Sequence, residues 1–351
     1  MKTIQYLKQN GLDSLQKEFA IKANQHEDGR VILNYDQIES YKCKTHPIVC
    51  ECRGLVLDSS DWSLVARSFE RFFNLGEDRI SQDKFIWDKC IATHKEDGSL
   101  LIVYYRDGWH INTRGSYGDG ECNYSGMTWH DLAKLAGLDT SSLDKQYTYV
   151  FELCSRYNKV VRDYPNPTLY LLTMFNGEIE LTHDAVASFG HKTPTSTSFE
   201  DVFHVQSELS KFAENDPTFE GFVLRDVNNR RLKAKSGKYV ALHRTVNNGA
   251  IAHPKNLVQF VLDGEADEII AYFSELEPII LDVQEKIGKI EKELDDIWFA
   301  HHDERNRKKF AVAVKHHPFS FCLFQARDKG VHPVEIFRSN KDIIVNKLFR
   351  G

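Results

Sequence analysis

Lys95-Glu96-Asp97-Gly98-Ser99-Leu100 is the run on which the interpretation of this chain depends. A lysine, an acid two residues later and then a glycine form the arrangement needed for a lysine that attacks a nucleotide phosphate. Residues 100–105 predict a strand, and residues 109–113 predict the strand that returns beside it. Asp107-Gly108 between them predicts a hairpin turn, because both residues tolerate positive φ. A lysine held just before such a hairpin lies on a rigid edge, which suits a nucleophile.

A second group of lysines lies downstream, in the run Lys233-Ala234-Lys235-Ser236. Lysine attacks phosphorus only as the neutral amine. The reference pKa of a lysine side chain is about 10.4, so nearby cations or desolvation must favour the neutral form. Lys233 and Lys235 lie two apart on a predicted strand and therefore share one face. If that face meets Lys95, their charge would favour the neutral amine and hold the phosphates of ATP.

Three carboxylates and two glycines complete the candidate chemistry. Expulsion of pyrophosphate calls for a divalent metal, with Mg²⁺ the expected ion. Asp97, Glu152 (in Phe151-Glu152-Leu153) and Glu220 (in Glu220-Gly221-Phe222-Val223) are the carboxylates available to it. We expect Gly98 and Gly221 to lie where a side chain would collide with the bound nucleotide.

The composition sets broad limits. A chain of 351 residues is long enough for two domains, and 41% hydrophobic and 27% charged residues are ordinary for a soluble globular protein. The formal net charge is -6, whereas proteins that bind nucleic acid by general electrostatics are usually basic. Any nucleic-acid site must therefore be a local basic region on an acidic body.

Seven scattered cysteines indicate no disulfide framework and favour a reducing cytosol. Cys43, His46, Cys50 and Cys52 lack the paired spacing of a structural zinc site. We expect Cys50 and Cys52 to alternate along a strand and pack as small apolar side chains, with a metal site as the less favoured alternative. No signal-peptide core and no apolar stretch of about 20 residues are present, so the sequence predicts a soluble, cytoplasmic protein with no membrane segment.

The pattern along the chain changes near residue 246. Residues 1–245 predict mixed α and β structure, with strands at 29–36, 53–58, 147–154, 169–175, 220–226 and 231–242. Residues 190–197 predict a surface loop, and Ser198 is expected to cap a helix to about residue 213. Residues 246–351 predict helices; a heptad seam runs through Ile280, Val283, Ile287, Ile290, Leu294 and Ile297. Fewer than three heptads favours a helix hairpin within the chain. The expected solvated side consists of Glu285, Lys286, Lys289, Glu291 and Lys292.

The order of these motifs resembles that of the covalent nucleotidyltransferases, the superfamily of ATP-dependent ligases and RNA-capping enzymes. In detail it is most similar to the phage-type RNA ligase 1 family, over nearly the whole chain. Besides the motifs above, the resemblance includes Tyr35, Glu51-Cys52-Arg53-Gly54, Arg71-Phe72-Phe73-Asn74, Arg114-Gly115-Ser116, Tyr239 and Leu262-Asp263-Gly264-Glu265-Ala266-Asp267. Arg71 and Arg114 replace family lysines, which keeps the charge but changes its geometry.

The resemblance implies a role for each matching residue. Lys95 falls on the adenylated lysine. The nucleotide-binding set it implies is Tyr35, Arg53, Arg71, Phe73, Asp97, Gly98, Arg114, Glu152, Glu220, Gly221, Lys233, Lys235 and Tyr239. The metal set it implies is Glu152, Glu220 and Asp267.

The implied fold is α+β: a nucleotidyltransferase domain of antiparallel sheets with helices over residues 1–245, then a small all-α domain over 246–351. The implied activity is ATP-dependent ligation of RNA ends bearing a 5′-phosphate and a 3′-hydroxyl, with Mg²⁺, for which Mn²⁺ can substitute. The steps are lysyl-AMP formation, transfer of AMP to the RNA 5′-phosphate, and sealing. The all-α domain is implied to select the RNA, with nicked tRNA as a candidate substrate, and the chain is expected to act as a monomer in the cytoplasm of a cell or of a virus host.

Two alternatives remain. DNA ligases and capping guanylyltransferases commonly carry arginine five residues after the lysine, where this chain has Leu100, so another enzyme of the superfamily is disfavoured. A non-catalytic RNA-binding relic of the ligase fold is disfavoured because the lysines and carboxylates are intact. No P-loop is present, since Ser236-Gly237-Lys238 lacks the upstream glycine.

Overall fold

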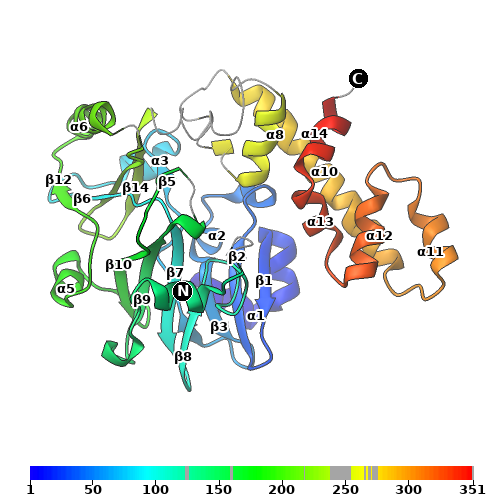
Figure 1. Cartoon of the computed structure of the whole chain (residues 1–351), viewed down its shortest axis with the longest axis horizontal. Coiled ribbons are helices and arrows are strands. Elements are labelled where there is room, and N and C mark those ends of the chain that lie inside the picture. Colours follow the sequence, from blue (N-terminus) through cyan, green and yellow to red (C-terminus); the bar gives the residue numbers. More distant parts are fainter. Residues whose placement is uncertain are drawn as a thin grey trace. The chain divides into compact units, whose positions relative to one another are not determined.

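The computed structural model describes residues 1–122, 126–158, 161–216, 218–237, 254–264, 266–267, 270 and 276–349. The chain divides into two compact units, Met1–Val246 and Asn247–Gly351 (Figure 1). The first unit is built from three β-sheets, and the described part of the second is helical. This confirms the predicted α+β class, with antiparallel sheets followed by a helical region.

The first sheet carries the N-terminal helix. Its strands are β1 (Ile21–Gln25), β2 (Arg30–Tyr35), β3 (Arg53–Asp58) and β4 (Leu64–Ala66), paired antiparallel in chain order. Helix α1 (Lys2–Phe19) packs on it through Leu7, Leu15 and Phe19, which share one buried cluster with Leu33 and Leu55. The predicted strands 29–36 and 53–58 are confirmed.

The second sheet contains the hairpin that follows Lys95. Its order is β11 (Ile179–Glu180), β10 (Thr168–Asn176), β9 (Thr148–Cys154), β7 (Ser99–Tyr105) and β8 (Trp109–Asn112), all antiparallel. Asp107 has φ 57° in the predicted β7–β8 turn. Helices α4 (Trp129–Leu135) and α5 (His183–Ser188) contribute Trp129, Leu132 and Val186 to the core of this sheet.

The third sheet joins segments that are far apart in the sequence. Its order is β12 (Ser196–Ser198), β6 (Ile91–His94), β13 (Gly221–Arg225), β14 (Arg231–Lys235) and β5 (Phe73–Asn74). Only the β14–β5 pair is parallel among its described pairings. Helix α6 (Val202–Asn215) packs against it through Val205. Because β6 ends at His94 and β7 begins at Ser99, the chain crosses from this sheet to the second one at Lys95.

Two local predictions are wrong. Ser198 does not cap the helix: it ends β12, which pairs with β6, while the Asp201 carboxylate accepts a hydrogen bond from the His204 amide at 2.8 Å and caps α6. The predicted loop 190–197 therefore contains part of an edge strand. Strand β14 ends at Lys235, and the end of the predicted strand 231–242 lies outside the described residues.

The predicted cysteine strand is a helix. Pro47 opens α2 (Pro47–Glu51), and the His46 ring accepts a hydrogen bond from the Ile48 amide, so both helix-start positions favour α structure. Cys50 and Cys52 are buried, Cys50 within α2 and Cys52 at its C-cap. The remaining short elements of this unit are η1 (Glu39–Cys43), α3 (Arg79–Asp83), η2 (Thr140–Ser142) and η3 (Arg156–Asn158).

The second unit consists of packed helices. They are α8 (Pro254–Asp263), α10 (Glu277–His301), α11 (Arg307–Val314), α12 (Ser320–Lys329), α13 (Pro333–Ser339) and α14 (Lys341–Phe349). The heptad positions Ile280, Val283, Ile287 and Leu294 of α10 are fully buried. Glu291, predicted to be solvated, is also buried, because Arg338 of α13 donates hydrogen bonds to its carboxylate at 2.6 and 2.8 Å. None of the helices in the described ranges has the length and apolar character to cross a membrane.

Candidate active site

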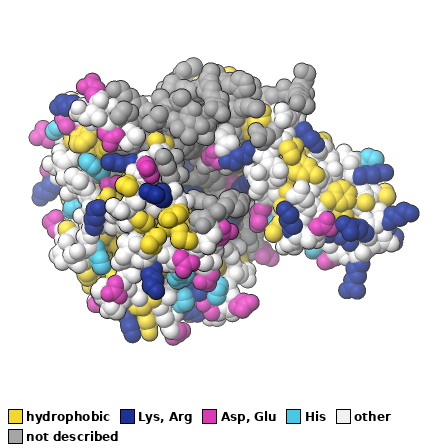
Figure 2. All heavy atoms as spheres, in the orientation of Figure 1, with side chains coloured by type: hydrophobic (Ala, Val, Ile, Leu, Met, Phe, Trp, Pro, Cys, Tyr) yellow, Lys and Arg dark blue, Asp and Glu magenta, His cyan; other side chains and the backbone are white. Residues whose placement is uncertain are grey.

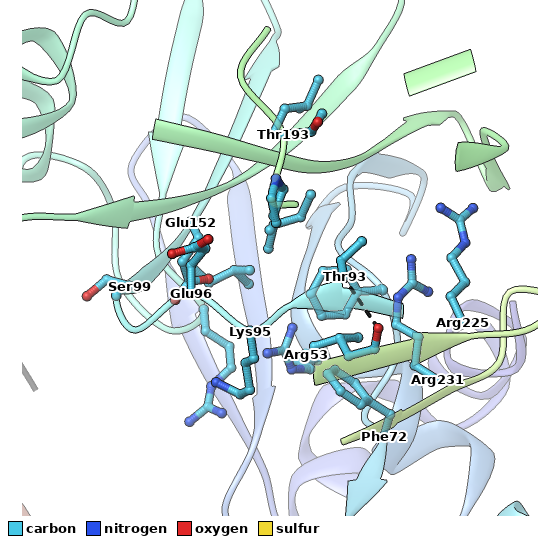
Figure 3. A pocket seen from close by; sticks show the side chains of 18 of the residues that line it. Arg53, Phe72, Thr93, Lys95, Glu96, Ser99, Glu152, Thr193, Arg225 and Arg231 are labelled. Atoms are coloured by element: carbon cyan, nitrogen blue, oxygen red, sulfur yellow. Dashed lines mark hydrogen bonds between the residues drawn. The ribbon is translucent and has the colours of Figure 1, made fainter. Parts of the chain in front are cut away.

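Lys95 faces a cavity of about 560 Å³ in the first unit, which we call the central pocket (Figure 3). Its walls come from the β6–β7 connection, from β3, β9 and β14, and from the segment after β8. Five of the residues singled out from the sequence line it: Arg53, Lys95, Gly98, Arg114 and Glu152. The crossing between two sheets thus places the predicted nucleophile, a carboxylate and two arginines around one space.

Glu220 holds two lysines at one oxygen. Lys95 Nζ lies 2.7 Å from Glu220 Oε1, and Lys235 Nζ lies 3.1 Å from the same atom. The backbone fixes this arrangement, since the Lys95 amide donates to the Gly221 carbonyl at 2.8 Å and the Ser236 amide to the Glu220 carbonyl at 2.7 Å. Lys233 shares the half-buried face of β14 with Lys235, but its Nζ lies 5.2 Å from the centre of the Phe72 ring.

The two motif glutamates have opposite electrostatic environments. Burial opposes ionisation of Glu220, but attraction to Lys95 and Lys235 outweighs it and lowers the pKa of Glu220. Burial raises the pKa of Glu152 to about 7, an effect that Lys95 opposes and Glu220 reinforces. Glu220, beside the pocket, is therefore ionised next to the lysines, whereas Glu152, on the pocket wall, exchanges its proton near neutral pH.

Arginines surround Tyr35 from two sides. The Cζ atoms of Arg71 and Arg114 lie 4.4 and 5.3 Å from the centre of the Tyr35 ring, and Arg114 Nη1 donates to the Tyr35 hydroxyl at 3.4 Å. Burial would raise the pKa of Tyr35, but Arg114, then Arg71 and Arg53, outweigh it and lower the value to about 8. The Arg71 Cζ is also 5.6 Å from the Phe73 ring centre.

Arg53 offers a hydrogen-bond donor to a ligand. Its Cζ lies 4.6 Å from the centre of the Phe69 ring and 5.8 Å from that of Phe72. Burial lowers the pKa of Arg53 to about 10, and its buried Nη1 atom has no hydrogen-bond partner among the described residues. A buried guanidinium nitrogen with no acceptor, lining a cavity, fits an anionic ligand such as a phosphate.

The Asp97 side chain connects the β6–β7 loop to the loop that follows η3. Its carboxylate accepts hydrogen bonds from the Val161 and Arg162 amides at 2.8 and 2.7 Å. The Asp97 amide donates to the Tyr164 hydroxyl at 3.2 Å, and that hydroxyl donates to Glu96 at 2.9 Å. Glu96 lines the central pocket whereas Asp97 does not. The motif thus presents its first acid to the cavity and uses the second to anchor the loop.

The two motif glycines are explained by protein contacts. A Cβ on Gly98 would lie 2.3 Å from the Leu153 carbonyl oxygen, and one on Gly221 2.1 Å from the Ala234 carbonyl oxygen. Gly221 also has φ +144°. We had expected a collision with bound nucleotide; here the colliding groups are the neighbouring strands.

The remaining predicted residues have different positions. Arg71 and Phe73 line a neighbouring cavity of about 690 Å³, which shares Phe72 and Arg231 with the central pocket. Tyr239 lies outside the described residues. Asp267 is a half-buried helical residue of the second unit.

Sequence reasoning missed several residues of the pocket wall. Glu96, Ser99, Phe69, Phe72, Arg225 and Arg231 all line it. Arg231 could have been predicted from the alternation of side chains along a strand, because it lies two residues before Lys233 and shares its face of β14. The guanidinium of Arg231 donates to Glu180 and lies 4.7 Å from the Phe69 ring centre.

The central pocket offers carboxylates to a divalent metal. No group of three or more His, Cys, Asp or Glu side chains that could hold a metal occurs within the described ranges. Glu96 and Glu152 line the pocket and Glu220 adjoins it. Oxygen donors of this kind suit Mg²⁺, which is bound through one or two carboxylates plus waters and substrate phosphates.

Comparison with known proteins assigns the family. The phage-type RNA ligase 1 family model, described as RNA ligase, matches residues 51–240. A protein of Autographa californica nuclear polyhedrosis virus, provisionally named bifunctional polynucleotide kinase/RNA ligase, is 33% identical over 78% of this chain and 42% of its own length. The chain thus spans less than half of that relative. An RNA ligase of Rhodothermus phage RM378 is 23% identical over 86% of this chain and 85% of its own.

Solved structures agree with the fold. A protein of Aquifex aeolicus, provisionally named ATP-dependent DNA ligase, superposes with a TM-score of 0.50 at 14% identity, over 83% of this chain and 79% of its own. At that identity the likeness concerns the fold alone. With a family model matching more than half of its residues and a relative at 33% identity, the chain belongs to the phage-type RNA ligase 1 family.

Proposed function

We propose that the chain is an ATP-dependent RNA ligase that joins a 5′-phosphate and a 3′-hydroxyl RNA end. The observation that carries this proposal is Lys95 at the wall of the central pocket, bonded to Glu220 together with Lys235. Membership of the RNA ligase family supports the reaction class. We further propose that residues 1–245 perform the nucleotidyl transfer and that residues 246–351 select the RNA, with nicked tRNA as a candidate.

In the first step the Lys95 amine attacks the α-phosphorus of ATP. The Lys95 ammonium of the ion pair first releases one proton to solvent and becomes the neutral amine. The new N–P bond then forms as the Pα–O bond to the β-phosphate breaks, pyrophosphate leaves with the bonding electrons, and the nitrogen releases a second proton to solvent. Arg53, Arg71 and Arg114, with Lys233 and Lys235, supply the positive charge that the triphosphate needs. Tyr35 and Phe73 support these cations by ring contacts, while Asp97, Gly98 and Gly221 fix the backbone around the nucleophile.

The second and third steps return the lysine to its free state. An oxygen of the RNA 5′-phosphate attacks the α-phosphorus, the N–P bond breaks, and Lys95 recovers two protons from solvent. The 3′-hydroxyl oxygen then attacks the RNA 5′-phosphorus, AMP leaves, and the hydroxyl proton is lost to solvent or a base. We assign Tyr239 to these later steps.

A divalent metal is the implied cofactor, with Mg²⁺ proposed and Mn²⁺ as a substitute. When bound it supplies charge neutralisation for the leaving pyrophosphate. Glu152 and Glu220 are the proposed holders in the first unit, where Glu96 adds a carboxylate on the pocket wall. Asp267, in the second unit, is proposed separately as a metal ligand. We propose that the enzyme acts as a monomer in the cytoplasm.

Incubation with Mg²⁺ and α-labelled ATP, followed by denaturing electrophoresis, tests the first step. We expect a labelled band that Lys95→Ala abolishes and that Lys134→Ala, a change of an exposed lysine on α4, retains. The label should be acid-labile and alkali-stable, as a phosphoramide is. Label from GTP but not ATP would favour a capping enzyme, and no label from folded protein would favour the RNA-binding relic.

Adding 5′-phosphorylated RNA to the labelled enzyme tests the later steps. We expect transfer of AMP to RNA and then a sealed product resistant to phosphatase. Persistent enzyme label with RNA, but transfer to 5′-phosphorylated DNA, would contradict the proposed substrate while keeping the adenylation chemistry.

A further inference from the structure

The second unit carries a basic surface on an otherwise acidic chain. Between residues 305 and 329 the sequence has seven lysines and arginines and a single acid, Asp328, although the whole chain has a net charge of -6. Figure 2 shows dark blue side chains gathered over the α11–α12 end of this unit. We call this surface the α11 basic patch; its residues are Arg305, Arg307, Lys308, Lys309, Lys315, Arg327 and Lys329.

The fold brings two parts of this patch together. Arg327, in the last turn of α12, donates from Nη2 to the Arg305 carbonyl at 3.1 Å, and its Cζ lies 4.6 Å from the centre of the Phe310 ring of α11. Arg307 of α11 forms an ion pair with Asp328 of α12, with 3.2 Å between Arg307 Nη2 and Asp328 Oδ1. The start of α11 and the end of α12 therefore form one continuous positive surface.

Exposed side chains lie along α11 and at both of its ends. Arg305 precedes the helix, Lys308 and Val312 lie within it, Lys315 is its C-cap, and all four are exposed. No carboxylate of the described residues forms an ion pair with Arg305, Lys308, Lys309 or Lys315. Val312 is 57% exposed, and Phe299, near the end of α10, is 84% exposed. Free cations with interspersed apolar side chains suit a polyanion that also offers flat, apolar bases.

Helix stability does not explain these cations. Arg307, Lys308 and Lys309 occupy the first turn of α11, which has no acidic residue. Cations at a helix N-terminus oppose the helix dipole, which favours acids there. The buried residues Phe310 and Val314 already attach α11 to the unit. Lys308 and Lys309 therefore oppose the helix dipole without an ion pair to compensate. Residues that depart from a local stability rule in this way are expected at a functional surface.

We infer that the α11 basic patch binds the phosphate backbone of RNA, and so deepens the RNA ligase function proposed above, on which it rests. The partner is a polyanion, and among polyanions RNA is favoured because the chain belongs to an RNA ligase family. The contacts are with phosphates, so binding is independent of base sequence and weakens as salt rises.

The test compares two charge-reversal variants of the full chain. The patch variant is Lys308→Glu, Lys309→Glu and Lys315→Glu. The control is Lys286→Glu, Lys289→Glu and Lys292→Glu on α10, where the three lysines are also exposed and the change in net charge is the same. Binding of a 5′-phosphorylated single-stranded RNA is measured by fluorescence anisotropy between 50 and 200 mM NaCl, together with self-adenylation by ATP and thermal unfolding.

We expect the patch variant to lose on the order of 10- to 100-fold in RNA affinity at 50 mM NaCl, with a log–log salt slope smaller by about 2. Its self-adenylation should match that of the control, and its unfolding temperature should be no lower, because acids suit the first turn of α11 whereas the control loses the Lys286–Asp282 ion pair. The RNA affinity of the control should stay within about threefold of that of the unchanged protein. Equal RNA affinity in the two variants overturns the inference. Binding of phosphatidylserine vesicles that depends on the patch, with RNA affinity unchanged, also overturns it in favour of a membrane surface. If self-adenylation is absent in the unchanged protein while patch-dependent RNA binding persists, the proposed ligase activity fails and the patch assignment stands.

Discussion

Lys95 and Glu220 form an ion pair of 2.7 Å that links the β6–β7 connection to the start of β13, and Lys235 shares the same carboxylate oxygen. Glu220 is 4% exposed, so its charge is compensated by the two lysines and not by water. Lys95 and Lys235 are thus positioned by one acid.

Replacing this acid should destabilise the protein. Glu220→Gln leaves Lys95 and Lys235 facing each other without a counter-charge, and loss of one partner of a buried pair costs about 3–5 kcal/mol, less here because the lysines are partly exposed. We expect a loss of about 2–3 kcal/mol at pH 7 in urea denaturation. Since the folded pKa of Glu220 lies below 4.5, its contribution is fully present above that pH and is lost as pH falls through the folded value. A variant as stable as the unchanged protein at pH 7 would contradict the role of the pair.

Glu152 should give the opposite pH dependence. Its folded pKa of about 7 exceeds the ordinary 4.5, so between these values the folded state binds more protons than the unfolded one. The unfolding free energy should therefore fall as pH rises from about 4.5 to about 7, by at most about 3 kcal/mol, and level off above pH 7. Urea denaturation at several pH values checks this slope. Glu152→Gln should remove it, whereas the exposed change Glu27→Gln should keep it.

Tyr164 is expected to act as a positioning residue. Tyr164→Phe removes the hydroxyl that donates to Glu96 and accepts from the Asp97 amide. Because both partners are partly or fully buried, we expect a stability loss of about 1–2 kcal/mol. The rate constant of self-adenylation should fall about tenfold, with the KM for ATP unchanged, because Glu96 loses its orientation beside Lys95. Tyr157→Phe, on the exposed side chain of η3, is the control. A higher KM with an unchanged rate constant would argue for direct ATP contact instead.

The motif glycines should resist substitution for steric reasons. Gly98→Ala and Gly221→Ala place a Cβ within 2.3 and 2.1 Å of carbonyl oxygens on neighbouring strands, and such overpacking costs about 1–3 kcal/mol or more. Gly108→Ala, where nothing lies within 4 Å of the added Cβ, should change stability by about 0.5 kcal/mol or less. Thermal unfolding without nucleotide separates this account from a ligand clash: unchanged melting of the first two variants, with lost ATP binding, would favour the clash.

The sequence indicated several residues that meet at or beside the central pocket, but not how they lie around it. Lys95, Glu152, Glu220 and the lysines of β14 could be singled out from the sequence because their motifs are short and contiguous. The sequence did not show that Glu96 faces the pocket while Asp97 anchors the loop. These roles depend on Tyr164 and on the amides of residues 161 and 162. The spacing within the motif contains no information about that distant loop.

Local errors have similarly identifiable causes. Cys50 and Cys52 alternate like strand residues, yet Pro47 and the His46 cap start a helix there. Glu291 has the composition of a solvated helix face, yet Arg338 arrives from another helix and allows its burial. In each case a single cap or partner outweighed the pattern of the surrounding residues.

The order of strands in the third sheet has a consequence for protein synthesis. Strand β6, which leads into Lys95, is hydrogen-bonded only to β12 and β13 among the described strands, and both are encoded long after it. A nascent chain that ends before Glu220 contains Lys95 but neither its acid nor Lys235. The Lys95–Glu220–Lys235 contact therefore cannot form on the ribosome until translation has passed Lys235, and we expect fragments truncated before that point to be inert towards nucleotide.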